Sequence, residues 1–197
     1  VLFEYMGTIW KNAPVLRDLC GSNSGPRRDV DRCVMHINQS TITCLPLGDG
    51  SKIRGQRAND IIADEFASIP DKVKSKARTK RAKELGMGSQ KTLDSPQDKS
   101  NQIILSGTAY YDFNHFADYW KRYRAIVNSG GRESALQEVF GGDVPVDFDW
   151  TEYSVVRMPV ENLPDGFMDS GQVSRAKATI HSGIFNMEYG ACFTTDS

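Results

Sequence analysis

Short apolar runs that alternate with segments of helical character place the strongest constraint on the fold of this chain. Residues 60–63 and 102–105 are short, apolar and rich in β-branched side chains, and residues 151–158 form a third, longer run. Strands that alternate with helices indicate a parallel α/β sheet. We therefore predict that the three runs are parallel neighbours in one sheet, with Ile61 and Ile62 at buried positions.

Helices are predicted from apolar residues at three- and four-residue spacing and from their end signals. Asn114 is a suitable N-terminal cap for a long helix through Val127 that ends before Gly130. The same reasoning predicts helices at 1–12, 71–84, 133–140 and 172–189, a further turn at 16–20, and a break near Ser182 in the last helix.

The segments between these elements are polar or rich in turn residues. Residues 32–37 and 41–47 are β-like runs around Asn38-Gln39-Ser40 and predict a hairpin. Residues 21–31, 86–101 and 159–171 are predicted as loops, the second of them mobile.

Composition sets the class of protein. The chain has 197 residues, of which 39% are hydrophobic and 25% charged, enough for one α/β domain with a real core. No run approaches the apolar length of a membrane helix. The four cysteines are far apart, which predicts buried free thiols in a reducing cytosol and no structural zinc site. The net charge of −1 gives no argument for nucleic acid.

Polar side chains follow the first two predicted strands directly. Asp64 and Glu65 come after the first strand, and Ser106, Gly107 and Thr108 after the second. Ligands bind at the carboxyl edge of open α/β sheets, so these residues are expected on one edge. An Asp there holds Mg²⁺ through water in phosphate-loop NTPases, and a following Glu polarises the attacking water. The alternative is a solvated strand end followed by a Ser/Thr helix cap.

Three segments of the chain, taken together, resemble the ATPase part of large terminase subunits, the DNA-packaging motors of tailed bacteriophages. The resemblance is closest over residues 41–70 and 102–124 and extends more weakly over 151–193. The segments are "LPLGDGSKIRGQRANDIIADEFASIP", "IILSGTAYYDFNHF" and "IFNMEYGACF".

The resemblance implies a role for individual residues. Asp64 and Glu65 match the Walker B acidic pair, with Asp64 in the metal shell. Arg54 matches an arginine that acts on the ATP of a neighbouring subunit, with Arg57 as its rival and a plain surface arginine as the alternative for both. The coupling motif that links hydrolysis to movement matches Ser106, Gly107 and Thr108.

The resemblance also implies a fold, cofactors and partners. The fold is a RecA-like (ASCE) P-loop NTPase fold, with a mostly parallel sheet flanked by helices. The cofactors are ATP and Mg²⁺. The partners are double-stranded DNA, the portal protein, the small terminase subunit and further copies in a homo-oligomeric ring, expected to be a pentamer, in the cytoplasm of the infected bacterial host. No membrane is involved.

The chain departs from the family in two respects, and one is that the segment from Pro70 to Lys72 is shorter than the family pattern predicts. The other is the missing phosphate loop. The chain contains no G-x-x-x-x-G-K-[ST] loop, and it starts without Met inside a predicted helix. We expect the Walker A loop before Val1 and a nuclease domain after Ser197, so that residues 1–197 are a partial ATPase domain. Residues 1–150 would be its core and residues 151–197 its C-terminal end.

Two further interpretations remain open. The chain could belong to another motor of this sheet class, such as a helicase-like ATPase, or it could be a non-enzymatic DNA-binding module. The module would use residues 71–84, which carry seven basic and two acidic residues, including Lys74, Arg78 and Arg81. These charges run all round the predicted helix, as on a solvated face. Aromatic residues in the second segment could stack on bases, although core packing fits their helical spacing. These are Tyr110, Tyr111, Phe113, Tyr119 and Trp120.

Overall fold

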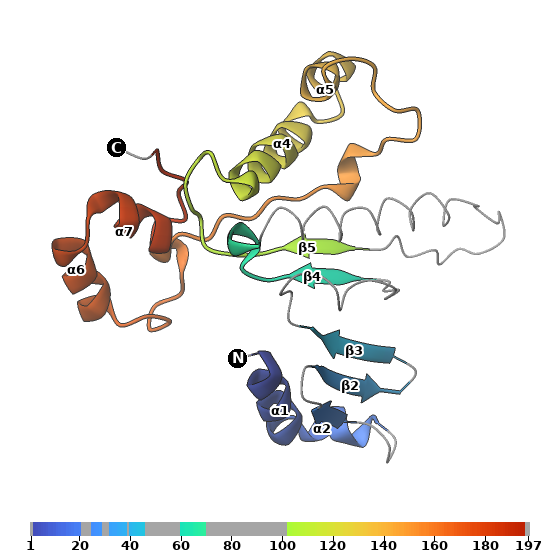
Figure 1. The fold of residues 1–197 in the computed structure, drawn as a ribbon, viewed down its shortest axis with the longest axis vertical. Coiled ribbons are helices and arrows are strands. Elements are labelled where there is room, and N and C mark those ends of the chain that lie inside the picture. The colour runs from blue at the N-terminus through green and yellow to red at the C-terminus, as the bar shows by residue number, and fades with distance from the viewer. Residues whose placement is uncertain are drawn as a thin grey trace. The chain divides into compact units, whose positions relative to one another are not determined.

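The computed structural model describes residues 2–20, 25–28, 32–38, 40–45, 60–69 and 102–195 (Figure 1). The chain divides into two compact units. The first comprises Val1–Asp60 with Ile69–Gln102, and the second comprises Ile61–Ser68 with Ile103–Ser197.

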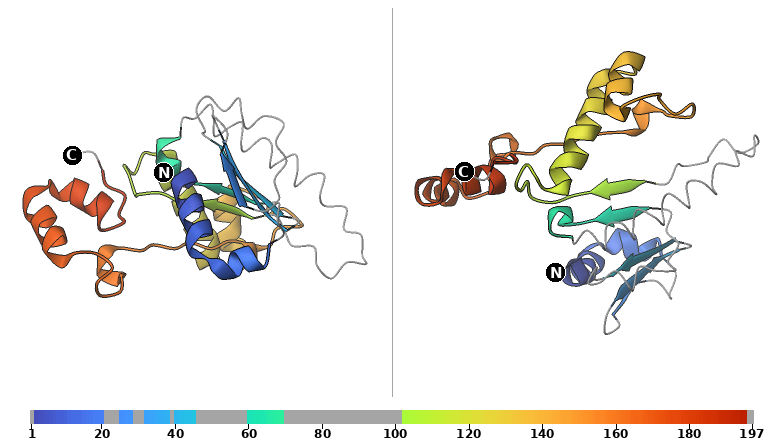
Figure 2. Two further views of the ribbon diagram at one scale, coloured as in Figure 1. Left: turned by 90° about the horizontal axis from the view of Figure 1, so that it is seen from below. Right: turned by 45° about the horizontal axis from the view of Figure 1, so that its top comes forward.

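The first unit contains two helices and an antiparallel sheet. Helix α1 (Leu2–Asn12) confirms the predicted helix. Helix α2 (Pro14–Asp18) begins two residues before the turn predicted at 16–20, because Pro14 is its first residue. Strands β2 (Cys33–Ile37) and β3 (Ser40–Cys44) form the predicted hairpin, with Ile37 paired to Ser40 next to the turn. Met6 on α1 packs against Cys33 and Met35 of β2, so the helix covers one face of the sheet (Figure 2).

The prediction of a loop over residues 21–31 is wrong in part. Strand β1 (Gly25–Arg28) pairs antiparallel with β2, so that Pro26 lies opposite Met35. Its proline is compatible with a strand because, among the described strands, β1 lies at the edge of the three-stranded sheet, where one row of backbone groups does not need a donor. Gly25 has φ +119°, and a Cβ there would lie 3.1 Å from the Trp10 ring. The glycine thus allows β1 to approach α1 closely.

The second unit contains a parallel strand pair. Strands β4 (Ile61–Ala63) and β5 (Ile103–Leu105) lie side by side with Ile61 paired to Ile103, which confirms the parallel arrangement predicted for them (Figure 1). The burial predicted for Ile62 is wrong. Alternate side chains of a strand face opposite sides of a sheet, and Ile62 is 70% exposed whereas Ile61 is half-buried.

Two helices follow β5 as predicted. Helix α4 (His115–Ser129) begins after Asn114, whose Oδ1 accepts a hydrogen bond from the Phe116 N–H, and ends at Gly130 in the left-handed conformation. Helix α5 (Glu133–Phe140) packs against α4. Gly131 lies between the two helices. Only glycine fits there, because a Cβ would lie 2.5 Å from the Trp150 indole.

The prediction of a third strand at residues 151–158 is wrong. Residues 150–152 form a 3-10 helix, and residues 153–159 have no regular secondary structure. The Asp149 side chain caps this helix by accepting from the Thr151 N–H. The ring of Tyr153 packs on Tyr123 of α4, with centroids 5.2 Å apart. The Tyr153 ring therefore packs against a helix, whereas Val156 and Met158 of the same segment are exposed.

The C-terminal part of the second unit contains helices α6 (Ser170–Thr179) and α7 (Ser182–Glu188), preceded by a 3-10 helix, Val160–Asn162. The predicted break lies at Ile180-His181, close to the expected place. After α7, Thr194 forms a parallel bridge with Tyr111. Phe193 consequently packs on Phe116 and Trp120 of α4.

Candidate functional site

The carboxyl ends of β4 and β5 meet and bring two sequence motifs together. The Ser106 N–H donates to the Ala63 carbonyl at 3.0 Å, so the hydrogen bonding to β4 continues one residue past β5. The Ser106 hydroxyl then donates to Asp64 Oδ1 at 3.0 Å. We call Asp64, Glu65 and Ser106–Thr108 the strand-end site. The prediction that the acidic and hydroxyl motifs share one edge of the sheet is confirmed for Asp64 and Ser106.

The backbone of the acidic motif is turned sharply. Glu65 has φ +49°, a left-handed conformation that costs an L residue about 1–2 kcal/mol. The turn is closed by hydrogen bonds from the Ser68 N–H to the Glu65 carbonyl and from the Phe66 N–H to the Ser106 carbonyl, both at 2.9 Å. Asp64 and Glu65 are both exposed, so their carboxylates are accessible to a ligand. Strained backbone of this kind is common at functional sites.

Gly107 lies against this turn. A Cβ at Gly107 would be 3.1 Å from the Phe66 nitrogen and 3.4 Å from the Glu65 Cα. The central residue of the hydroxyl motif is therefore a glycine for a packing reason, since a larger residue would push the acidic turn away. Thr108, one residue further, is half-buried.

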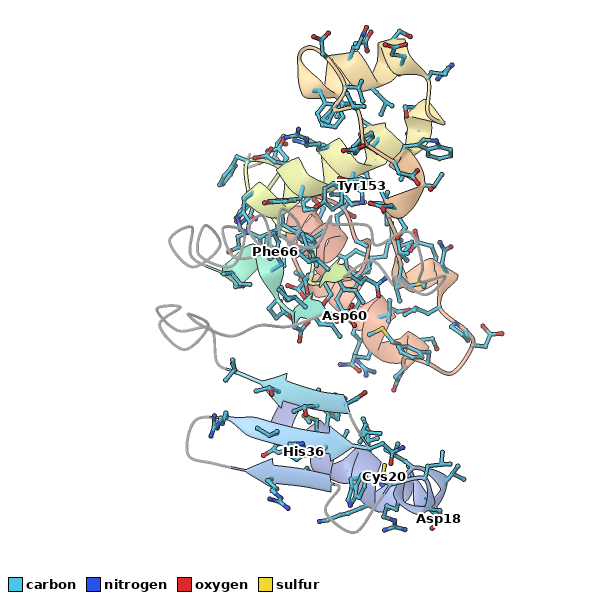
Figure 3. The ribbon with its side chains drawn as sticks, turned by 90° about the vertical axis from the view of Figure 1, so that its right-hand side faces the viewer. Asp18, Cys20, His36, Asp60, Phe66 and Tyr153 are labelled. Atoms are coloured by element: carbon cyan, nitrogen blue, oxygen red, sulfur yellow. The ribbon has the colours of Figure 1, made fainter. Side chains whose placement is uncertain are left out.

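Phe66 anchors the acidic turn in the second unit. Its side chain is 7% exposed and is labelled in Figure 3. Its ring makes edge-to-face contacts with the rings of His115, Phe116 and Tyr119, at centroid distances between 5.0 and 5.8 Å. Such pairs stabilise by about 0.5–1.5 kcal/mol each beyond the area that they bury.

The N-terminus of α4 fixes the same turn by two polar contacts. The His115 Nε2 atom donates to the Phe66 carbonyl at 2.8 Å, and the Asn114 Nδ2 atom donates to the Ala67 carbonyl at 3.1 Å. We call Asn114 and His115 the helix clamp. The clamp, Gly107 and the Phe66 ring contacts thus all hold the backbone turn that carries Asp64 and Glu65.

The helix clamp was not predicted, although Asn114 was recognised as a helix cap. Its contacts join residues 47 and 49 positions apart in the chain, and no local pattern signals such a pairing. The aromatic segment was predicted to pack in the core, and Tyr119 and Trp120 do pack on other rings. The prediction is wrong for Tyr110 and Phe113, which are 46% and 68% exposed.

Several predicted site residues lie outside the described residues. Arg54 and Arg57 belong to residues 46–59, which the structure does not describe. The basic helix predicted at 71–84 is also outside the described residues. The same is true of its three candidate DNA-binding residues, Lys74, Arg78 and Arg81, and of the loop predicted at 86–101.

The donor set of the strand-end site suits Mg²⁺ better than a transition metal. Mg²⁺ is usually bound by one or two carboxylates, with water and substrate phosphates completing its shell. Asp64 and Glu65 are exposed neighbouring carboxylates of this kind. Within the described ranges, no three His, Cys, Asp or Glu side chains gather as a metal-binding group. The four cysteines are free thiols, but the burial predicted for them holds for Cys33 alone, since Cys20, Cys44 and Cys192 are half-buried.

Comparison with protein-family models, with curated proteins and with solved structures found no match for this chain. In the part of the chain that the structure describes, no helix has both the length and the apolar character that crossing a membrane requires.

Proposed function

We propose that the strand-end site is the Walker B and coupling region of an ATP-hydrolysing motor, the ATPase of a large terminase that moves double-stranded viral DNA into a procapsid. The observation that carries the proposal is the hydrogen bond between Ser106 and Asp64 at the carboxyl ends of two adjacent parallel strands. In this sheet class, nucleotides bind at that edge. The ordered resemblance of three segments to terminases supports the particular motor.

Each residue of the site has a distinct task in this proposal. Asp64 would hold Mg²⁺ through water, and the metal would supply neutralisation of phosphate charge when ATP is bound. Glu65 accepts a proton from the attacking water as general base. The Ser106 hydroxyl donates to Asp64, so a change in the position of Asp64 on hydrolysis is transmitted to the start of the coupling motif. Arg54 acts on the ATP of a neighbouring subunit in the ring.

The proposal assigns the phosphate-binding loop to residues before Val1. The 197-residue chain alone is therefore expected to bind ATP weakly or not at all and to show no turnover, because the β- and γ-phosphates lack their backbone N–H groups and lysine. The portal protein, the small terminase subunit and a homo-oligomeric ring, expected to be pentameric, complete the proposed motor in the host cytoplasm.

The test uses the longer chain that includes the residues before Val1. Glu65→Gln preserves the shape of the side chain and removes the base, so we expect ATP binding to persist while turnover falls by at least about 100-fold. The matched control is Glu138→Gln, a substitution of an exposed glutamate on α5, which should leave turnover unchanged. Binding is measured with a fluorescent ATP analogue and turnover by phosphate release. Unchanged turnover of Glu65→Gln would exclude Glu65 as the base.

A further inference from the structure

A group of sulfur atoms in the first unit is not part of the strand-end site. Cys33 on β2 is directly opposite Cys44 on β3, and Met35 lies opposite Ile42 in the same ladder. Cys33 is 2% exposed, and it packs with Met6 and Met35 in the core of the unit. Cys44 is half-buried and packs against the same cluster.

The register of the hairpin places the two cysteines opposite each other, at a spacing that a disulfide can span. Opposite residues of an antiparallel pair have Cα atoms about 4.5 or 5.5 Å apart, depending on their place in the ladder. Both values fall inside the range of about 4.4–6.8 Å that disulfides span. Opposite residues also point to the same face of a sheet, so Cys33 and Cys44 are on one side of the hairpin.

The side chain of Cys44 is directed toward the core. Its thiol donates to the Met6 Sδ atom at 2.9 Å, and Met6 is itself in contact with the cluster that contains Cys33. Burial raises the pKa of the Cys44 thiol, and the neighbouring Cys33 raises it further, as expected for two thiols that are close together.

We infer that Cys33 and Cys44 are a thiol pair that a low-molecular-weight disulfide, such as glutathione disulfide, converts to a cross-strand disulfide. Cys44 is the more accessible of the two thiols, and it reacts through the fraction that is deprotonated. Its thiolate attacks one sulfur of glutathione disulfide, forms a mixed disulfide and releases one glutathione thiolate. The Cys33 thiolate then attacks the Cys44 sulfur and releases the second glutathione. Two protein thiols are oxidised by two electrons, glutathione disulfide is reduced to two thiols, and these take up the two protons.

The sequence provides a direct way to detect this bond. Trypsin releases residues 33–52 as one peptide that contains both cysteines, while Cys20 and Cys192 are on other peptides. Cyanogen bromide then cleaves this peptide after Met35, between the two cysteines. A Cys33–Cys44 disulfide makes the tryptic peptide two hydrogens lighter and keeps its two fragments joined until a reductant is added.

The experiment treats the folded 197-residue chain with glutathione disulfide, blocks the remaining thiols and analyses the peptides by mass spectrometry. We expect the Cys33–Cys44 disulfide to be the main intramolecular product. In concentrated urea the strands no longer align the two thiols. Cys20 should then also form disulfides with Cys33 and with Cys44. A 33–52 peptide that stays reduced while Cys20 or Cys192 carries glutathione would overturn the inference, as would the same exclusive pairing in urea.

Two variants separate the steps. Cys33→Ser should stop the reaction at glutathionylated Cys44, because the second thiol is missing. Cys44→Ser should leave Cys33 largely unmodified, because Cys33 is 2% exposed. Circular dichroism verifies that each variant is folded. Rapid glutathionylation of Cys33 in folded Cys44→Ser would contradict the proposed order of attack.

Discussion

Substitution of Asn114 by Ala tests the helix clamp quantitatively. Asn114 makes two different hydrogen bonds with the two ends of its amide. Its Oδ1 atom accepts from the Phe116 N–H at 2.9 Å and caps α4, and its Nδ2 atom donates to the Ala67 carbonyl at 3.1 Å and holds the acidic turn. Asn114→Ala removes both bonds at once.

The expected loss is the sum of these two contributions. Loss of an N-terminal cap costs about 1 kcal/mol, and loss of a half-buried hydrogen bond costs about 1 kcal/mol more. The sum of about 2 kcal/mol corresponds to an increase of about 30-fold in the opening equilibrium of α4. Asn114→Ser keeps a capping oxygen but has no donor that reaches Ala67, so its expected increase is about fivefold.

Native-state hydrogen exchange of the α4 amides measures these opening equilibria. The matched control is Asn128→Ala, a substitution of an exposed asparagine near the end of the same helix, for which we expect little change. Exchange in Asn114→Ser equal to that of the unmodified chain would show that the Ala67 bond contributes nothing. Equal effects of Asn114→Ala and Asn114→Ser would refute the capping contribution.

Three further predictions follow from the site and its surroundings. In the chain extended by the proposed phosphate loop, Arg54→Ala subunits should bind ATP but not hydrolyse it in the ring. Mixing them with Glu65→Gln subunits should restore part of the turnover. No recovery at any mixing ratio would favour Arg57 as the trans-acting residue. Gly107→Ala should lower the free energy of unfolding by about 1–2 kcal/mol, because its Cβ would lie 3.1 Å from the backbone of the acidic turn, and urea unfolding measures this. Hydrogen bonds from the Thr151 hydroxyl, and to a lesser extent from the Thr151 N–H, lower the pKa of Asp149. The ionised cap therefore stabilises the folded chain above the ordinary carboxyl pKa, and this stabilisation is lost as the pH falls through the lowered pKa. Thr151→Val should raise the pKa of Asp149, which an NMR titration measures.

Elements with strong local signals could be predicted from the sequence. The cap at Asn114 and the glycine at 130 gave the bounds of α4, and the short apolar runs gave β4 and β5. The meeting of Asp64 and Ser106 followed from a topological rule, since the carboxyl ends of adjacent parallel strands share one edge. A RecA-like sheet with further strands stays a prediction.

The errors have a common physical origin. Gly25 and Pro26 have the composition of a loop, and only pairing with β2 makes that segment a strand. The segment around Trp150 has the composition of a strand but packs on helices instead. In both cases a contact between distant residues decides the local structure, and such contacts cannot be read from a single sequence. The helix clamp was missed for the same reason.

The central claim is that the edge formed by Asp64 and Ser106 is a nucleotide site. The most direct measurement is a crystal structure, with Mg²⁺ and a non-hydrolysable ATP analogue, of the chain extended by the phosphate-binding loop that the proposal places before Val1. We predict that the γ-phosphate and Mg²⁺ lie at this edge, with the Asp64 carboxylate within one water-bridged contact of the metal and the Glu65 carboxylate facing the γ-phosphate. Nucleotide bound at the opposite end of β4 and β5, or away from these strands altogether, would contradict the claim.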